Sequence, residues 1–350
     1  MDTTKLEAVG LTKRYGDVAA LLPTDLQVRA GEFLTLLGPS GSGKTTLLMM
    51  ISGLVAPSGG KLMIDGRDAT HADPGRRGIG MVFQNYALFP HLTVWDNVAY
   101  GLRMRRTPRT ELAAAVDEAL AMVRMQDFGR RYPKELSGGQ QQRIALARCF
   151  AYRPSVILLD EPLGALDKKL REHMQLEIRR LHGELGATFI YVTHDQDEAL
   201  TMSDRICLMN QARIEQIGTP AELYDCPATR FAANFIGQSN LLDGRMEGPD
   251  AIRLGDRVVP VTHARRPALG LQDEASLLVR PETVELTPPA DGLLAGTVSE
   301  LVFLGSEVRA IVTLPSNKAF SVRCSRNDSP RLGEQVGLRW DLARASLLSH

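Results

Sequence analysis

A glycine-rich stretch at residues 38–46 carries the clearest chemistry in the sequence. It matches the pattern Gly-x-x-x-x-Gly-Lys-Thr and lies between two apolar runs, at 33–37 and from Leu47, where a buried strand would turn into a helix. Glycines let backbone N–H groups approach phosphate oxygens, and the start of the helix favours an anion. We expect Lys44 to reach the outer phosphates and Thr45 to offer its hydroxyl to Mg²⁺. A turn that binds nothing is the alternative, but every fixed position is present. The predicted phosphate-binding residues are Gly38, Pro39, Ser40, Gly41, Ser42, Gly43, Lys44, Thr45 and Thr46.

Two adjacent acids, Asp160 and Glu161, follow the apolar run 156–159. Such a run is typical of a buried parallel strand, and ligands sit at the carboxyl ends of these strands. We expect Asp160 to hold Mg²⁺, directly or through water, and Glu161 to orient or deprotonate the attacking water. A strand that merely ends in acids is the alternative, and the phosphate loop upstream favours the catalytic interpretation.

Two further apolar runs also end in polar side chains. Gln84 closes the run 79–83, where it could touch the Mg²⁺ or the attacking water, although a glutamine that simply ends a strand is the other interpretation. His194 follows the run 189–192 and Thr193, and it could donate a hydrogen bond to the γ-phosphate. A lone histidine at a strand end is usually structural, but His194 would lie at the same sheet edge as the polar residues that end the other apolar runs.

A second glycine-containing stretch lies at 136–140, Leu-Ser-Gly-Gly-Gln. Ser137 with Gln140 three residues later fits a capping box, which predicts a helix start. Gly138 and Gly139 leave the amides bare, and bare amides at a helix start favour an anion. Tyr15 lies in a polar turn and could stack on a nucleotide base, or could simply be exposed.

The elements that must position these residues follow an α/β pattern. Short strand-like pieces at 6–11, 18–22 and 26–28 predict an antiparallel sheet before the phosphate loop. From residue 93 to about 152 helical signals replace strand signals, with Leu112, Val116, Leu120 and Val123 at helix spacing. Buried strands return at 156–159 and 189–192. The fold predicted for this part is an α/β phosphate-loop ATPase with a RecA-like core, an antiparallel β subdomain and a helical subdomain at about 88–153.

The periodicity changes after residue 236 to short strands separated by turns. Strands are expected at 252–261, split at 255–256, and at 276–279, 296–302, 308–314, 319–324 and 335–340. We therefore predict two domains, an ATPase at 1–236 and a small all-β, OB-like barrel at 237–350.

Composition narrows the function classes. The chain has 350 residues, 44% hydrophobic and 23% charged, as in soluble globular proteins with more than one domain. Lys plus Arg and Asp plus Glu both number 41, so net charge gives no reason to expect nucleic acid as a partner. The four cysteines lack Cys-x-x-Cys spacing, which indicates reduced thiols. No segment reaches the roughly 20 apolar residues of a membrane span, and no signal core is visible at the N-terminus.

The motifs occur in one order: the phosphate loop, Gln84, the stretch 136–140, Asp160-Glu161, Gly-Ala-Leu-Asp at 164–167, and His194. Together they resemble the nucleotide-binding subunit of ATP-binding cassette (ABC) transporters, over roughly residues 5–236. The signature stretch 136–140 separates this family from other phosphate-loop ATPases. One departure is Gly164, where the family usually has serine, so this position offers no hydroxyl for a contact across the dimer.

The resemblance implies a head-to-tail dimer in which each ATP lies between the phosphate loop of one copy and the signature stretch of the other. It implies that Tyr15 stacks on adenine, Gln84 senses the γ-phosphate and Glu161 is the general base. It further implies that Asp160 supports Mg²⁺ and that Asp167 and His194 couple the two sites. The residues that would cap the partner's ATP are Ser137, Gly138, Gly139 and Gln140.

The family works with separate integral membrane permease subunits, and indirectly with an extracytoplasmic solute-binding protein. The resemblance places the permease contact at the apolar loop 87–91 and the chain at the cytoplasmic face of the inner membrane, as a peripheral subunit. No nucleic acid is expected.

Residues 279–282, Val-Arg-Pro-Glu, and the junction 235–237 resemble the regulatory (TOBE-type) barrel of importer ATPases. This domain could sense a solute or could support dimerisation. The stretches 213–220 and 235–240 look most like the spermidine/putrescine-type importers, although sugar, iron and sulfate relatives share the architecture. The alternative function is that of a soluble, non-transport ABC ATPase, and a purely regulatory binding module is disfavoured because all the hydrolytic residues are present.

Overall fold

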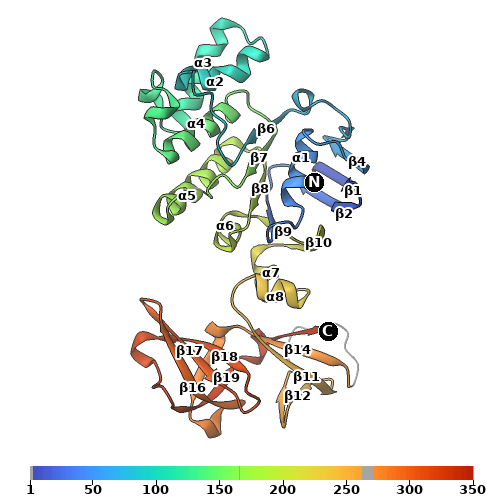
Figure 1. The fold of residues 1–350 in the computed structure, drawn as a ribbon, viewed down its shortest axis with the longest axis vertical. Coiled ribbons are helices and arrows are strands. Elements are labelled where there is room, and N and C mark those ends of the chain that lie inside the picture. The colour runs from blue at the N-terminus through green and yellow to red at the C-terminus, as the bar shows by residue number, and fades with distance from the viewer. Residues whose placement is uncertain (1–2, 165, 262–271, 350) are drawn as a thin grey trace. The chain divides into compact units, whose positions relative to one another are not determined.

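The computed structural model describes residues 3–164, 166–261 and 272–349, and it divides into two compact units (Figure 1). The first unit comprises Met1–Pro220 and the second Ala221–His350. The boundary predicted at residue 236 falls inside the second unit, after two short helices.

The first unit opens with the predicted antiparallel sheet. Its strands are β1 (Thr4–Tyr15), β2 (Val18–Arg29), β4 (Gly59–Ile64) and β5 (Arg67–Asp68), in the order β2-β1-β4-β5. The pieces expected at 18–22 and 26–28 form one strand, β2. The pairing of β2 with β1 shifts its register around Pro23, because the nitrogen of proline has no hydrogen to donate.

A six-stranded sheet forms the centre of this unit, in the order β10-β9-β3-β8-β7-β6. Its strands are β3 (Phe33–Leu37), β6 (Ile79–Val82), β7 (Val156–Asp160), β8 (Thr188–Thr193), β9 (Arg205–Asn210) and β10 (Arg213–Gly218). All pair in parallel except β10, which runs antiparallel to β9. Every residue of β3, β7 and β8 is buried, as expected for parallel strands covered on both faces.

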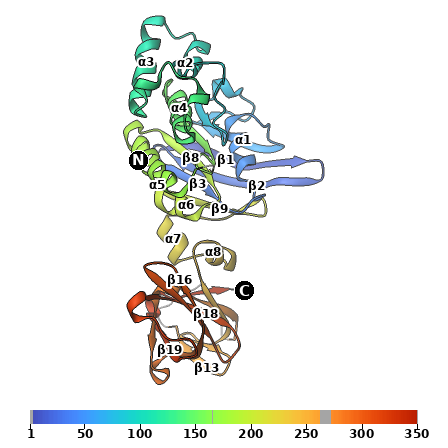
Figure 2. The same cartoon turned by 60° about the vertical axis from the view of Figure 1, so that its left-hand side comes forward.

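Alternate side chains of these strands enter two different hydrophobic clusters. Phe33 packs with helices on one face, whereas Leu34 packs on the other face with the antiparallel sheet. The helices are α1 (Lys44–Ser52), α2 (Val94–Met104), α3 (Arg109–Met122), α4 (Gly138–Phe150), α5 (Lys168–Leu185) and α6 (Gln196–Met202). Residues of α2 to α5 belong to the first cluster and those of α1 to the second, so α4 and α1 lie on opposite faces of the sheet. Figure 2 shows α2, α3 and α4 grouped together, as the sequence predicts for the helical insertion. Short 3₁₀ turns lie at Pro74–Arg76, Gln126–Phe128 and Pro133–Glu135.

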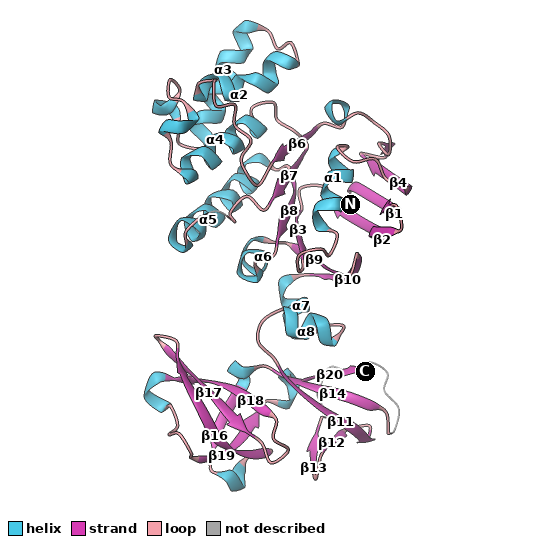
Figure 3. Cartoon of the chain, viewed as in Figure 1, coloured by secondary structure: helices cyan, strands magenta, loops and turns pink. Residues whose placement is uncertain are grey.

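The second unit begins with two short helices and is otherwise built of strands (Figure 3). The helices are α7 (Pro220–Asp225) and α8 (Arg230–Phe235). One five-stranded sheet has the order β13-β12-β11-β14-β20, from β11 (Asn240–Gly248), β12 (Ala251–Leu254), β13 (Arg257–Pro260), β14 (Glu274–Val279) and β20 (Ser346–Ser349). The other has the order β15-β19-β16-β17-β18, from β15 (Val284–Thr287), β16 (Leu294–Phe303), β17 (Glu307–Thr313), β18 (Ala319–Ser325) and β19 (Gln335–Trp340). The 3₁₀ turns of this unit lie at Pro281–Thr283, Pro289–Asp291, Arg326–Asp328 and Leu342–Arg344. Both sheets contribute to one hydrophobic core, which confirms the prediction of an all-β, OB-like second domain.

A buried arginine joins the two helices to the strands of this unit. The guanidinium of Arg280 donates hydrogen bonds to the carbonyl oxygens of Tyr224 in α7, of Ala233 in α8, and of Ile236 and Gln238 beyond it. Donors that meet the free carbonyls at helix ends satisfy groups that otherwise lack partners. These bonds explain why α7 and α8 belong to the second unit.

Among the described residues, no helix is long and apolar enough to cross a membrane.

Candidate functional site

Four adjacent parallel strands, β3, β8, β7 and β6, end at the same edge of the central sheet. The phosphate loop follows β3, His194 follows β8, Glu161 follows β7 and Gln84 follows β6 shortly after its last residue. The structure therefore brings together the polar groups that the sequence distributes over more than 150 residues.

Lys44 is buried inside the phosphate loop. Its Nζ donates to the carbonyl oxygens of Gly38 at 2.8 Å and Pro39 at 2.9 Å, and lies 3.4 Å from Oγ of Ser42. Burial lowers the pKa of Lys44, and the charges of the two strand-end acids oppose that effect. A Cβ on Gly38 would lie 2.2 Å from the carbonyl oxygen of Met209, so the loop requires glycine there.

Asp160 is buried at the end of β7, where the Thr45 side chain is hydrogen-bonded to it. Burial, together with the neighbouring charge of Glu161, raises the pKa of Asp160. A cation beside this carboxyl group would therefore be favoured, because it would offset both effects.

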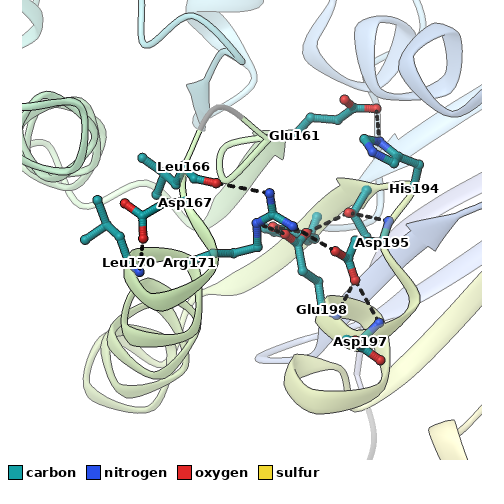
Figure 4. A network of polar contacts seen from close by, with 11 residues as sticks. Glu161, Leu166, Asp167, Leu170, Arg171, His194, Asp195, Asp197 and Glu198 are labelled. Atoms are coloured by element: carbon teal, nitrogen blue, oxygen red, sulfur yellow. Dashed lines mark hydrogen bonds and ion pairs between the residues drawn. The ribbon is translucent and has the colours of Figure 1, made fainter. Parts of the chain in front are cut away.

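Glu161 stands between two other predicted catalytic residues. Nε2 of Gln84 donates to its Oε2 at 3.3 Å. On the other side, Nδ1 of His194 lies 3.3 Å from its Oε1 (Figure 4). The backbone of Glu161 has φ 43°, in the left-handed region that non-glycine residues rarely adopt. Such conformations concentrate at functional sites.

The oxygen donors at this edge fit Mg²⁺. No group of three or more His, Cys, Asp or Glu side chains able to hold a metal ion occurs in the described part of the chain. Mg²⁺ is usually held by one or two carboxylates together with substrate phosphates and water, and does not need such a group. Asp160, Thr45 and Gln84 can supply a carboxylate, a hydroxyl and an amide oxygen.

The signature stretch 136–140 lies elsewhere, around the start of α4. The backbone N–H of Gln140 donates to Oγ of Ser137 at 3.4 Å, and the backbone N–H of Ser137 donates to Oε1 of Gln140 at 3.0 Å, as the capping box predicts. Gly138 is exposed and Gly139 is buried. Among the residues described, no hydrogen bond or ion pair joins this stretch to the phosphate loop.

The two remaining predicted site residues also have clear positions. Tyr15 is 55% exposed at the end of β1, where its ring can be reached, and Nζ of Lys13 lies 4.9 Å from the ring centroid. Asp167 caps α5, accepting from the N–H of Leu170 at 3.0 Å.

Arg148, which the sequence did not single out, fixes the loop after Gln84. From α4 it donates to the carbonyl oxygens of Tyr86 at 2.9 Å and Ala87 at 2.7 Å, and both residues have positive φ. Nothing in the helical pattern of α4 distinguishes this arginine from its neighbours, so only the folded chain reveals its role.

A groove of about 670 Å³ opens beside the same loop. Its lining includes Phe83, Phe89, Tyr100, Met104 and Arg148, from the loop, α2 and α4. The rings of Phe89 and Tyr100 lie 4.5 Å apart, and Met104 is 66% exposed, which gives the groove an apolar rim.

Two family profiles match the chain. Residues 21–164 match the ABC transporter family, and residues 277–348 match the TOBE domain. The chain is 48% identical, over 97% of its length and 92% of the relative, to the spermidine/putrescine import ATP-binding protein PotA of Rubrobacter xylanophilus. It is 47% identical to the protein of the same name in Thermobifida fusca, over 96% of this chain and 90% of that one.

Solved structures resemble the first unit. The ATP-binding cassette MJ0796, solved as a dimer in a post-hydrolysis state bound to ADP and Pi, is 34% identical with a TM-score of 0.56, over 61% of this chain and 98% of that one. The protein cbiO1 of Clostridium perfringens, part of the ABC transporter complex cbiONQ, is 30% identical with a TM-score of 0.59, over 64% of this chain and 91% of that one. The chain belongs to the ABC transporter family, as an ATP-hydrolysing import subunit with a C-terminal TOBE domain.

Proposed function

We propose that the sheet edge described above binds ATP with Mg²⁺ and hydrolyses it with Glu161 as general base, to drive polyamine import. The observation that supports this most directly is the position of the Glu161 carboxylate between Gln84 and His194, beside the phosphate loop.

In this mechanism the loop amides and Lys44 bind the β- and γ-phosphates, and Tyr15 stacks on adenine. Thr45, Asp160 and Gln84 would hold Mg²⁺, which when bound would neutralise charge on the phosphate oxygens.

Glu161 accepts a proton from water as the water oxygen bonds to the γ-phosphorus. The bond from that phosphorus to the bridging oxygen breaks, and ADP leaves. His194 donates a hydrogen bond from its other ring nitrogen to a γ-phosphate oxygen, while Nδ1 faces Glu161.

A second copy of the chain completes each site. Helix α4, which begins with the signature stretch, lies on the opposite face of the sheet from α1, which follows the phosphate loop. Residues 137–140 are therefore well placed to meet the nucleotide of another copy. The dimeric state of MJ0796 supports this arrangement. Dimer closure on ATP and opening after hydrolysis would then move the attached subunits.

The groove beside Phe89 and Tyr100 is proposed to receive the permease at the cytoplasmic face of the inner membrane. Its apolar rim and its contact with the loop after Gln84 support a mechanical link to the ATP site. Co-purification with integral membrane subunits is expected, whereas a stable complex with ribosomes or DNA would contradict the proposal.

The polyamine assignment rests on relatives of that name that match across both domains. The test is ATPase activity of the complex reconstituted with its own permease and solute-binding protein. Spermidine or putrescine should stimulate turnover, and maltose or sulfate should not. Stimulation by one of the latter instead would overturn the polyamine assignment and leave the ATPase mechanism standing.

A further inference from the structure

One arginine holds two loops of the candidate site at once. Nη2 of Arg171, near the start of α5, donates to the carbonyl oxygen of Leu166 at 3.1 Å, and Nη1 donates to Oδ2 of Asp195 at 3.2 Å (Figure 4). Leu166 directly precedes Asp167, and Asp195 directly follows His194. The guanidinium therefore connects the backbone beside one predicted functional residue to the side chain beside the other.

The loop after His194 also has hydrogen bonds of its own, which leave one oxygen of Asp195 for this arginine. Oδ1 of Asp195 accepts from the backbone N–H groups of Asp197 at 2.9 Å and Glu198 at 3.2 Å, and so caps α6. The backbone N–H of Asp195 donates to the hydroxyl of Thr193 at 3.0 Å. One carboxylate oxygen of Asp195 thus holds the helix, and the other faces Arg171.

A buried carboxylate lies against the same guanidinium. The Glu198 side chain is only 4% exposed, and its Oε2 accepts from the hydroxyls of Tyr191 at 2.7 Å and Thr193 at 2.6 Å. Its Oε1 lies 3.8 Å from the Nε atom of Arg171. That Nε atom makes no hydrogen bond in the described structure. Burying a carboxylate without a nearby positive charge costs free energy. Glu198 therefore favours the position of the Arg171 guanidinium between the loops.

We propose that Arg171 is a positioning residue for ATP hydrolysis, which sets the loop of Asp167 and the loop of His194 in one arrangement while Glu198 retains its guanidinium. This inference rests on the roles proposed above for Asp167 and His194. Displacement of the second loop would move His194 away from Glu161, and a misplacement of about 1 Å can cost on the order of 100-fold in rate. ATP binding should change little, because Lys44 and the phosphate loop keep their own contacts and lose at most one hydrogen bond to the γ-phosphate.

The test compares Arg171→Gln, Asp195→Asn and the double variant in the full chain. Asparagine can still cap α6 through its Oδ1, but it removes the charge that faces Arg171. Each single change should lower kcat about tenfold or more and leave KM for ATP within about twofold. The double variant should be no slower than the slower single variant, because both changes break the same connection.

Arg179→Gln is the matched control. Arg179 lies on the same helix and forms a 2.7 Å ion pair with Asp204, and none of its contacts among the described residues reaches either loop. The Arg179→Gln variant should keep the wild-type kcat, while its melting temperature should change as much as that of the Arg171→Gln variant. A loss of kcat in Arg179→Gln equal to that in Arg171→Gln would show that Arg171 has only a structural role and would overturn the inference. Losses that multiply in the double variant would overturn it as well.

The inference and the proposed mechanism can fail separately. If His194→Ala abolishes turnover while Arg171→Gln and Asp195→Asn turn over normally, the inference is wrong and the mechanism stands. If His194→Ala retains full kcat, the proposed role of His194 is wrong and the inference fails with it.

Discussion

Replacing Glu161 with glutamine tests the proposed chemistry most directly. Glutamine has almost the same shape, and it can keep contacts to Gln84 and His194, which lie 3.3 Å from the two carboxylate oxygens. It cannot accept a proton from water at neutral pH. The substitution therefore removes one chemical capacity from an otherwise unchanged site.

The size of the effect follows from what the carboxylate does. General base catalysis contributes on the order of 10²–10⁴ in rate, which corresponds to about 3–5 kcal/mol of activation free energy. Binding should be retained because Lys44 is held by the carbonyl oxygens of Gly38 and Pro39 and does not depend on Glu161 for its position. The left-handed backbone of residue 161 persists in the variant, so stability should change little.

Steady-state release of phosphate measures kcat, and equilibrium binding of ATP measures affinity. Glu118→Gln is a control for the same chemical change, since Glu118 is exposed and pairs with Arg153 away from the strand ends. We expect Glu161→Gln to bind ATP as wild type does and, because nucleotide persists, to accumulate as an ATP-bound dimer. Turnover within about fivefold of wild type would refute the assignment of the general base.

Three further predictions concern stability. Arg280→Met leaves buried carbonyl oxygens without donors. It should lower the free energy of unfolding of the second unit, measured in urea, by at least about 2 kcal/mol. The control Arg339→Met breaks an exposed ion pair and should lower that free energy by less than about 1 kcal/mol. Burial alone would raise the pKa of Asp243, but hydrogen bonds from an arginine, a lysine and a serine outweigh it and hold the pKa below its ordinary 3.8. The stabilisation is therefore present above pH 3.8 and lost as the pH falls further, so thermal melts of wild type and Asp243→Asn should differ at neutral pH and converge in acid. Gly164→Ser should change the free energy of unfolding by less than about 0.5 kcal/mol in the same urea titration. The reason is that a Cβ at this position would lie no closer than 3.6 Å to the carbonyl oxygen of Glu161. A larger loss would show that the loop requires glycine.

Much of the first unit follows from the sequence because its central strands are continuous apolar runs. Runs at 33–37, 156–159 and 189–192 are all buried strands, and the polar residues after them must meet at one edge because parallel strands share their direction. The strand order β3-β8-β7-β6 could not be predicted, because periodicity says nothing about which strand pairs with which. That order is what puts Glu161 between Gln84 and His194.

The connecting arginines could not be predicted either. Arg148 and Arg171 lie at ordinary positions of helical patterns, and their acceptors are mainly backbone carbonyl oxygens, which every residue has. In the second unit the sequence pattern does not predict the strands β11, β15 and β20. In β11 the alternation of apolar and polar residues is interrupted by Asp243, Gly244 and Gly248. Gly244 is required there by close packing, since a Cβ would lie 2.2 Å from the carbonyl oxygen of Arg253.

The hydrogen bonds of Arg280 have a consequence for how such a domain could pass from one gene to another. The segment that matches the TOBE profile, 277–348, contains the arginine but neither α7 nor α8, and it lacks three strands of its own first sheet. A recombination event that moved only that segment would transfer a buried cation without its acceptors and a sheet with an open edge. The smallest piece that could be inherited intact is therefore 220–349, both helices included, and crossover points that survive selection should lie before α7.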